Sequence, residues 1–202
     1  MIRIRTFIDY WNIQLTMNEK LRHDRAKIDW QNIGSILAAN AAQKVKADEY
    51  SFDGVIIYAS FNPKNTENKS FNRWITTWLN RQPGVQVQCL ERQPKAPPKC
   101  PVCHQTIENC PHQACGAKIV GTIEKGVDTL ICTDMIRLAW EDAYDVAVLA
   151  SSDRDLVPAV QFLNSKGIKV VQAGFPPSGV HLATACWASF DMFSLCPQLI
   201  RQ

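Results

Sequence analysis

Apolar residues along this chain follow two periods, one typical of buried strands and the other typical of helices. Short, nearly continuous apolar runs recur, and between them the apolar residues fall three or four positions apart. The runs predict strands at residues 2–9, 54–61, 145–150 and 168–173, and the alternation of Val85, Val87 and Cys89 predicts a further strand at 85–89. The intervening periodicity predicts helices at residues 29–41, 71–79, 127–140, 156–166 and 181–188. Strands that alternate with helices favour an α/β fold with a mainly parallel sheet.

The bulk composition restricts the class of protein. The chain of 202 residues is long enough for one α/β domain with a small insertion, so we expect a single domain over residues 1–202. With 46% hydrophobic and 20% charged residues, it is globular, and its net charge of +3 permits an anionic partner without requiring one. No signal peptide begins the chain, and no run reaches the roughly 18 apolar residues that a membrane helix needs. We therefore expect a cytoplasmic protein with no membrane partner and no disulfides.

Residues 94–118 interrupt the alternation of strands and helices. Prolines at positions 94, 97 and 98 keep the start of this segment out of a helix or a central strand. The segment then reads CPVCHQTIENCPHQACG, in which Cys100 and Cys103 form one closely spaced pair and Cys110 and Cys115 form another. Two such thiol pairs are what a closed tetrahedral zinc site requires. We expect an inserted module with a structural Zn²⁺, because four protein ligands leave no open position for chemistry.

Two alternatives remain for this module. His112 can replace Cys110 in the ligand set, or the segment is a cysteine-rich loop without metal. The segment has hardly any large apolar residues, so zinc would have to supply its folding energy. Lys95, Lys99 and Lys118 surround it, and we expect it to extend a surface for an anionic partner or to bind a protein partner, a second copy of the chain included. The remaining cysteines fit buried packing positions: Cys89, Cys132, Cys186 and Cys196.

Acidic residues stand where predicted strands end and where a predicted helix begins. Asp9 ends the first strand, Asp153 and Asp155 follow the strand at 145–150, and Asp128 lies at a helix start. The carboxyl ends of parallel strands share one edge of a sheet, so Asp9 and Asp153 can converge there and Asp128 can join them. Clustered carboxylates repel one another unless a cation neutralises them, and Mg²⁺ or Mn²⁺ prefers such oxygen ligands.

Helix capping is the alternative explanation for two of these acids. Asp is a preferred N-cap, and Pro158 is favourable only among the first helical positions, which places the cap near Asp155. Asp155 is therefore either a cap or a metal ligand, whereas Asp153 has no capping role to explain it. Asn12 can orient a water molecule or satisfy the ends of strands. Asp134 fits a supporting position behind the site or a solvated charge on its helix.

The segments FIDYWN, KIDW, EKGVDTLICTDM and LASSDRDLVPAV, in that order, resemble the NYN domain. This is a branch of the PIN-like nucleases, and the bacterial LabA-like group is the most similar. The resemblance covers residues 4–193 apart from the cysteine insert. It implies a PIN-like Rossmannoid fold in three layers and metal-dependent cleavage of RNA phosphodiester bonds.

The resemblance also implies roles for individual residues. Matched motif to motif, the metal-binding acids of the family fall on Asp9, Asp128 and Asp153, with Asp155 as an additional acid. Asn12 matches the asparagine that follows the first aspartate of the family. These five residues are the expected catalytic set, with Mg²⁺ or Mn²⁺ as the catalytic cofactor.

The chain departs from the family pattern at two positions. Ser152 stands where a glycine is common, and Leu156 stands where an aromatic residue is common. Both changes can alter the geometry of the loop after the strand at 145–150, but neither removes a carboxylate.

The sequence thus favours a metal-dependent ribonuclease, with RNA as its partner. Lys64, Lys69 and Arg73 can contact phosphates and Phe61 can stack on a base, and the insert can extend this RNA surface. A solvated helix start is the favoured explanation of the residues at 61–74, because the excess of positive charge is small. A catalytically inactive RNA-binding or scaffolding protein of the same fold is the main rival. A haloacid-dehalogenase-type phosphatase is disfavoured, because it needs a second aspartate where this chain has Trp11.

Overall fold

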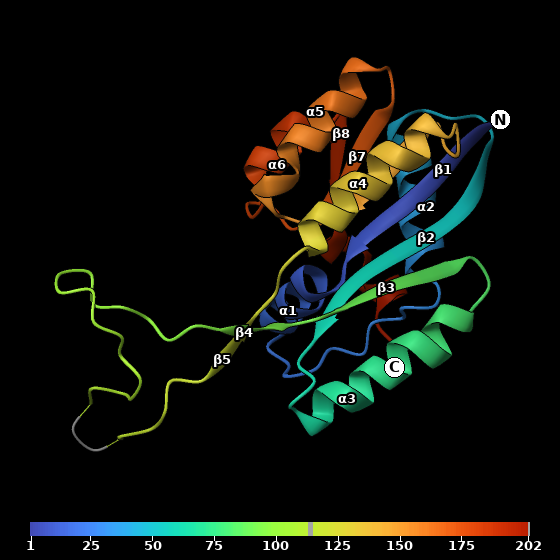
Figure 1. The fold of residues 1–202 in the computed structure, drawn as a ribbon. Coiled ribbons are helices and arrows are strands. Elements are labelled where there is room, and N and C mark those ends of the chain that lie inside the picture. The colour runs from blue at the N-terminus through green and yellow to red at the C-terminus, as the bar shows by residue number, and fades with distance from the viewer. Residues whose placement is uncertain (113–114, 202) are drawn as a thin grey trace.

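The computed structural model describes residues 1–112 and 115–201, so Gln113 and Ala114 of the expected insert and Gln202 lie outside the described residues. Within those ranges six strands form one sheet in the order β3-β2-β1-β6-β7-β8, and every neighbouring pair is parallel (Figure 1). The predicted α/β class is confirmed. The strands are β1 (Ile2–Asp9), β2 (Tyr50–Phe61), β3 (Val85–Glu91), β6 (Val146–Ala150), β7 (Lys169–Gly174) and β8 (Ala188–Asp191).

Helices cover both faces of this sheet and give the fold three layers (Figure 1). They are α1 (Tyr10–Leu21), α2 (Ile33–Lys44), α3 (Thr66–Arg73), α4 (Val127–Trp140), α5 (Val157–Ser165), α6 (Val180–Ala185) and α7 (Cys196–Leu199). One core lies under α4, α5 and α6, and a second lies under α1, α2 and α7. In the described part of the chain, no helix has both the length and the apolar character to cross a membrane.

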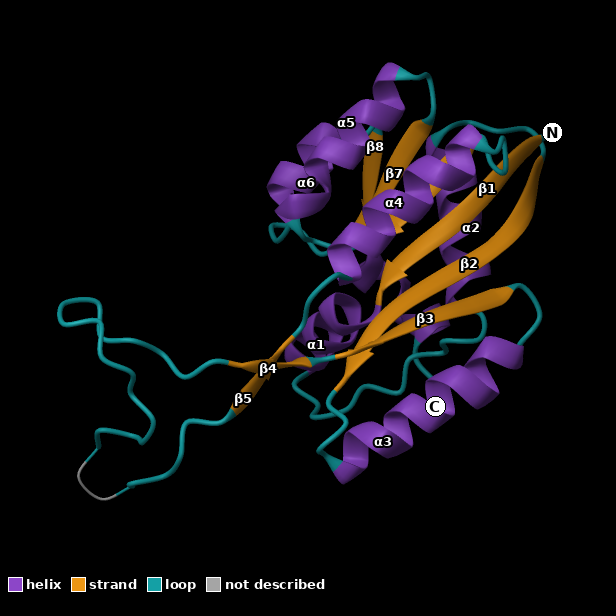
Figure 2. Cartoon of the chain, viewed as in Figure 1, coloured by secondary structure: helices purple, strands orange, loops and turns teal. Residues whose placement is uncertain are grey.

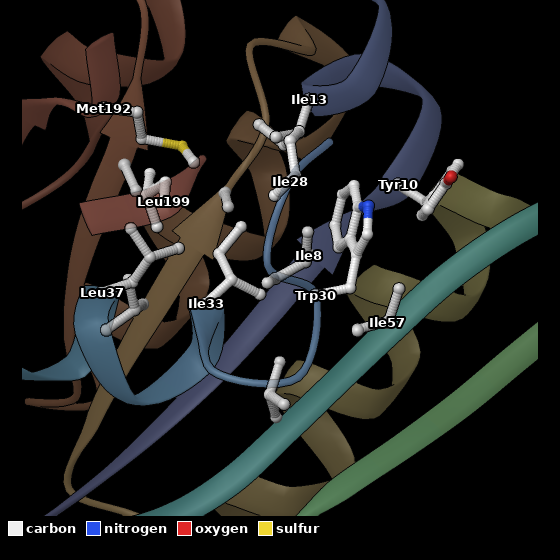
Figure 3. Packing of buried hydrophobic residues seen from close by; sticks show 14 of the residues in the cluster. Ile8, Tyr10, Ile13, Ile28, Trp30, Ile33, Leu37, Ile57, Met192 and Leu199 are labelled. Atoms are coloured by element: carbon white, nitrogen blue, oxygen red, sulfur yellow. The ribbon is translucent and has the colours of Figure 1, made fainter. Parts of the chain in front are cut away.

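The side chains of β1 alternate between the two cores. Phe7 packs in the core under α4, whereas Ile8 packs in the other core together with Ile33 of α2 (Figure 3). Gly34 lets α2 approach the sheet closely, since a Cβ atom at this position would lie 2.6 Å from the Cβ atom of Val55. Burial on both faces explains why the strands appear in the sequence as continuous apolar runs.

Helix α1 was not expected from the sequence. Its buried residues are Tyr10, Ile13, Gln14 and Met17, which do fall at helical spacing. One of the four is polar: the Gln14 side-chain amide donates to the carbonyl of Ala26 at 3.0 Å. A buried polar residue on the inner face masks the helical pattern, because only its tertiary partner makes the position a core position.

The expected helix at 29–41 begins later than predicted. The N–H of Ile33 donates to the backbone carbonyl of Asp29 at 2.9 Å, and Asn32 occupies the N-cap position of α2. Asp29, the first residue of the expected helix, therefore lies before α2 and is not its N-cap. Its carboxylate instead pairs with Arg201, with 2.5 Å between Nη2 and Oδ1. This ion pair ties the end of the chain to the segment before α2.

The other boundary differences are smaller. Helix α3 starts before the expected helix at 71–79 and continues through a π-helical segment (Trp74–Trp78) and a 3₁₀ turn (Leu79–Arg81). Strand β8, which was not expected, pairs with β7 and extends the sheet at one edge.

The cysteine segment projects from the body on a two-stranded antiparallel ribbon (Figure 2). The ribbon consists of β4 (Gln93–Lys95) and β5 (Gly121–Ile123). The expected module at 94–118 thus begins within β4 and ends before β5, and this ribbon is the stem of the insert. Because β4 follows β3 and β5 precedes α4, the stem emerges at the carboxyl edge of the sheet, where the acidic residues were expected.

Candidate functional site

Asp9 is the last residue of β1 and is buried, with 6% of its surface exposed. Its Oδ1 accepts the backbone N–H of Asn12 at 3.2 Å, which caps α1, and its Oδ2 accepts the hydroxyl of Ser151 at 3.4 Å. Burial, and to a lesser extent the nearby charges of Glu124, Asp128 and Asp153, raise the pKa of Asp9 to about 7 against the opposing effect of the Asn12 hydrogen bond. This carboxyl group therefore lacks a compensating positive charge.

Hydrogen bonds lock the ends of three neighbouring strands together beside Asp9. The side-chain Oδ1 of Asn12 accepts the backbone N–H of Ser152 at 3.0 Å, which joins the start of α1 to the loop after β6. The amide of Gln172, on β7, donates to the carbonyl of Ser151 at 2.9 Å. Asn12 therefore satisfies a backbone group at the end of a strand, which is one of the two uses expected for it. The loop that carries Asp153 is thereby held in one position relative to Asp9.

Asp153 and Asp155 follow β6, and the one that acts as a cap is Asp153. Asp153 accepts the N–H of Asp155 on its Oδ1 at 2.8 Å and caps the 3₁₀ turn Arg154–Leu156. Of the two explanations left open for Asp155, capping is not observed, because a 3₁₀ turn precedes α5 and Leu156 occupies the N-cap position of the helix. Pro158 does lie in the first turn of α5, as expected. Asp155 is exposed and lies near the other acids.

Asp128 lies in the first turn of α4, two residues after Gly126, which is the N-cap of this helix. That glycine has φ of 89°, a left-handed conformation that favours glycine and that turns the chain from the ribbon into the helix. Burial raises the pKa of Asp128, and the charges of Asp153, Glu124 and Asp155 raise it further. The structure therefore brings all four predicted acids into electrostatic contact at one edge of the sheet.

Glu124 is a member of this cluster that the sequence reasoning missed. It follows β5, and its carboxylate accepts a short hydrogen bond from the hydroxyl of Ser60 at the end of β2. Arg92 pairs with it, with 3.7 Å between Nη2 and Oε2, and Arg92 also donates to the Ser60 hydroxyl at 2.9 Å. Glu124 precedes Asp128 by four residues in the same EKGVDTL segment, which was the available signal.

Asp134 is not part of the cluster. It is buried, and its carboxylate accepts the hydroxyl of Tyr58 at 3.0 Å and pairs with Arg137 at 3.2 Å. It is therefore buried and paired, and it is not the solvated charge that was one of two expectations. The residues expected to contact phosphates follow the second strand of the sheet. Lys64 lies in the loop after β2, and Lys69 and Arg73 are exposed on α3.

The chemistry of the donor set fits a hard divalent cation, although the side chains do not converge on one point. Among the described residues, no group of three or more His, Cys, Asp or Glu side chains stands close enough together to hold a metal ion. The acids are nevertheless near enough to raise the pKa values of Asp9 and Asp128. The hydroxyl of Ser152 is buried beside them and has no hydrogen-bond partner within the described ranges. Oxygen donors with unbalanced negative charge are suited to Mg²⁺ or Mn²⁺.

Comparison with known proteins agrees with this arrangement. The NYN domain family matches residues 3–193 of the chain. The chain belongs to the NYN domain family. NYN domains are part of the PIN-like nuclease superfamily, and the mainly parallel sheet with helices on both faces is the α/β architecture of that group.

Two similar proteins give information on the fold but not on the activity. A crystal structure of a protein of unknown function, VPA0982 from Vibrio parahaemolyticus, has a TM-score of 0.53 and 17% sequence identity, and the match covers 95% of this chain and 93% of that one. An uncharacterized protein, y4oD from Sinorhizobium fredii, is 42% identical over 55 residues. That match spans 27% of this chain and 26% of the relative's length.

The insert of this NYN domain places its cysteine pairs in two small hairpin loops. Backbone bridges close the loops, one between Lys99 and Thr106 and the other between Asn109 and Lys118. Each loop holds one of the predicted thiol pairs. In the described residues, each of the eight cysteines has a free thiol.

The first hairpin loop has features that favour a thiolate. The backbone N–H groups of Cys103 and Val102 donate to the sulfur of Cys100 and lower the pKa of its thiol. The residue after the second cysteine of each pair, His104 or Gly116, has a positive φ, of 58° and 54° respectively. Both loops therefore turn sharply after the second thiol. The described residues do not bring the two pairs together into a single four-thiol cluster.

Proposed function

We propose that this NYN domain is a metal-dependent ribonuclease that hydrolyses RNA phosphodiester bonds at the cluster of Asp9, Asp128, Asp153 and Asp155. The observation that supports this most directly is the buried, uncompensated carboxyl of Asp9, whose pKa is raised to about 7. Uncompensated acids at the carboxyl ends of parallel strands lie where α/β folds bind their ligands. Membership of the PIN-like nuclease superfamily supports hydrolytic chemistry.

The four aspartates would hold Mg²⁺ or Mn²⁺, and the Glu124 carboxylate adds negative charge to the same cluster. When bound, such a cation neutralises charge on the phosphodiester and makes water a stronger acid. The residues of the chain hold the acids in place. The hydrogen bonds of Asn12 to Asp9 and Ser152 fix the positions of β1 and the loop after β6. The carboxylate of Asp153 is oriented by its own bond to the Asp155 N–H.

We also propose that the insert binds one structural Zn²⁺ through Cys100, Cys103, Cys110 and Cys115. The lowered pKa of the Cys100 thiol supports this, since zinc binds the thiolate form. The exposed positions of Cys103 and Cys115 leave their sulfur atoms accessible to a metal. His112 remains the alternative fourth ligand. It lies in the second hairpin loop, and its carbonyl accepts the N–H of Cys115 at 2.9 Å.

The test of the ribonuclease proposal is the cleavage of labelled single-stranded RNA by the whole protein with and without Mn²⁺. Asp153→Asn should abolish cleavage and leave the fold intact, because the amide keeps the oxygen that caps the 3₁₀ turn but removes the charge. Asp134→Asn is the matched control, since Asp134 pairs with Tyr58 and Arg137 away from the cluster, and it should retain cleavage.

Two results would contradict the proposal. Wild-type turnover by Asp153→Asn would show that this acid has no part in the reaction. A wild-type protein that binds RNA but does not cleave it in Mg²⁺ or Mn²⁺ would instead identify an RNA-binding or scaffolding protein of the same fold. Circular dichroism of each variant separates a lost activity from a lost fold.

A further inference from the structure

A pocket of about 410 Å³ lies between the body of the domain and the stem of the insert. Its lining comes from three segments: residues 62–64 after β2, residues 91–95 from the end of β3 into β4, and residues 120–122 around β5. The sequence contains no motif that predicts this pocket. It exists because the β4–β5 ribbon pairs beside the loop that leaves β2.

The lining of the pocket suits a nucleotide. Lys64, Arg92 and Lys95 supply three positive charges, against the single acid Glu91. Within the described residues, Lys64 and Lys95 form no salt bridge and are exposed, so both are available to an anion. Prolines 63 and 94 and the exposed Val120 add apolar surface next to these cations. Phosphate groups require the cations, and the faces of bases pack against apolar surface.

Arg92 connects this pocket to the carboxylate cluster. It lines the pocket, and at the same time it pairs with Glu124 and donates to the hydroxyl of Ser60. Glu124 is close enough to Asp9 to raise its pKa. The guanidinium of Arg92 also lies 5.7 Å from the ring centre of Trp11, which holds it against the body. Arg92 therefore lies between the pocket and the acids.

We propose that this pocket binds a nucleotide of a single-stranded RNA whose neighbouring phosphodiester lies at the carboxylate cluster. Lys64 and Lys95 contact the phosphates, and the apolar wall contacts the base. This inference rests on the proposed ribonuclease function. It extends that function by assigning substrate binding to the pocket between the body and the stem of the insert. The stem of the insert is then part of the substrate site.

The experiment measures the binding of a fluorescent single-stranded RNA by anisotropy at several salt concentrations in Mg²⁺. All proteins carry Asp153→Asn, and a gel verifies that the strand remains intact. The test variant is Lys64→Ala/Lys95→Ala. The matched control is Lys44→Ala/Lys166→Ala, which removes the same charge from the C-terminal ends of α2 and α5. These two helices end at the opposite edge of the sheet, where β2 and β7 begin.

The test variant should bind roughly tenfold more weakly, and the control should bind as the parent does. Loss of two phosphate contacts should also reduce the dependence of log K on log salt concentration by about 1.4, whereas the control should keep the parent slope. Equal binding by test variant and control would overturn the inference, as would a parent that does not bind the strand. If the wild-type protein binds through Lys64 and Lys95 but cleaves no RNA, the ribonuclease proposal fails and the pocket assignment stands.

Discussion

Asp9 illustrates how the fold changes the chemistry of a single residue. Burial and neighbouring carboxylates raise its pKa to about 7, from an ordinary value of 3.8. Between these two pH values the folded protein keeps a proton that the unfolded chain releases. The stability associated with this group is therefore greatest at low pH and is lost as pH rises toward 7. Above pH 7, Asp9 is ionised in both the folded and the unfolded protein, and the full free-energy cost of burying its charge lowers the stability. A bound cation would offset this cost.

We predict that the metal-free protein is less stable at pH 8 than at pH 5, with a contribution from Asp9 on the order of 2–3 kcal/mol. Asp9→Asn should remove most of this difference, since the amide carries no charge and still caps α1 through its oxygen. Urea denaturation of both proteins at the two pH values measures it. Saturating Mg²⁺ should stabilise the wild type at pH 8 more than it stabilises the variant. An unchanged pH dependence in Asp9→Asn would contradict the assignment.

At the scale of secondary-structure elements, the loop after β6 shows how one turn exchanges the roles of two aspartates. The 3₁₀ turn Arg154–Leu156 stands before α5, so the acid that caps is Asp153 and the acid inside the turn is Asp155. Asp153 therefore has a structural role in addition to its proposed role in metal binding. The two roles can be separated, because the cap needs an acceptor oxygen and the cation needs a charge.

We predict that Asp153→Ala lowers the free energy of unfolding by about 0.5–2 kcal/mol, the usual cost of a lost cap. Asp153→Asn should keep the stability of the wild type, because asparagine caps as well as aspartate. Asp155→Ala should change stability by less than about 0.5 kcal/mol, since its side chain is exposed and is not the cap. Chemical denaturation without divalent cations gives the three values. A larger loss in Asp155→Ala than in Asp153→Ala would refute the observed cap.

At the scale of the whole molecule, the body and the insert depend on different sources of stability. The two hydrophobic cores lie in the body, and no described residue between 93 and 123 contributes to either of them. The insert is held by the short β4–β5 ribbon and by the bridges that close its two hairpin loops. Apart from these backbone pairs, the proposed zinc is its main source of folding energy.

We predict one zinc per chain in protein purified without chelators, and its loss in Cys103→Ser. Hydrogen exchange should then show residues from about 100 to 116 losing protection, while β1, β2 and β6 keep theirs because their core is separate. His112→Ala should retain zinc if the four thiols are the ligands, and it serves as the control. Protein without zinc by elemental analysis would contradict the site. Retention by Cys110→Ser with loss in His112→Ala would favour the alternative ligand set.

The sequence by itself determined the helices and strands whose buried positions show as a regular pattern of apolar residues. Strands β2, β6 and β7 appear as apolar runs because a parallel sheet is covered on both faces, and α4 (Val127–Trp140) begins and ends where its periodicity predicts. The positions of Asp9 and Asp153 at the ends of strands followed from the same runs. The spacing of apolar residues was sufficient to predict these elements, because buried positions recur with the period of a strand or a helix.

Only the tertiary structure decided the parts that depend on contacts between distant segments. Helix α1 is stable because Gln14, a polar residue, finds a partner at Ala26 inside the core. Glu124 joins the acids because the ribbon returns the chain to Ser60 and Arg92. The pocket beside them has walls from three separated segments. These features depend on pairing across the fold, and a pattern along the chain does not record which distant residues meet.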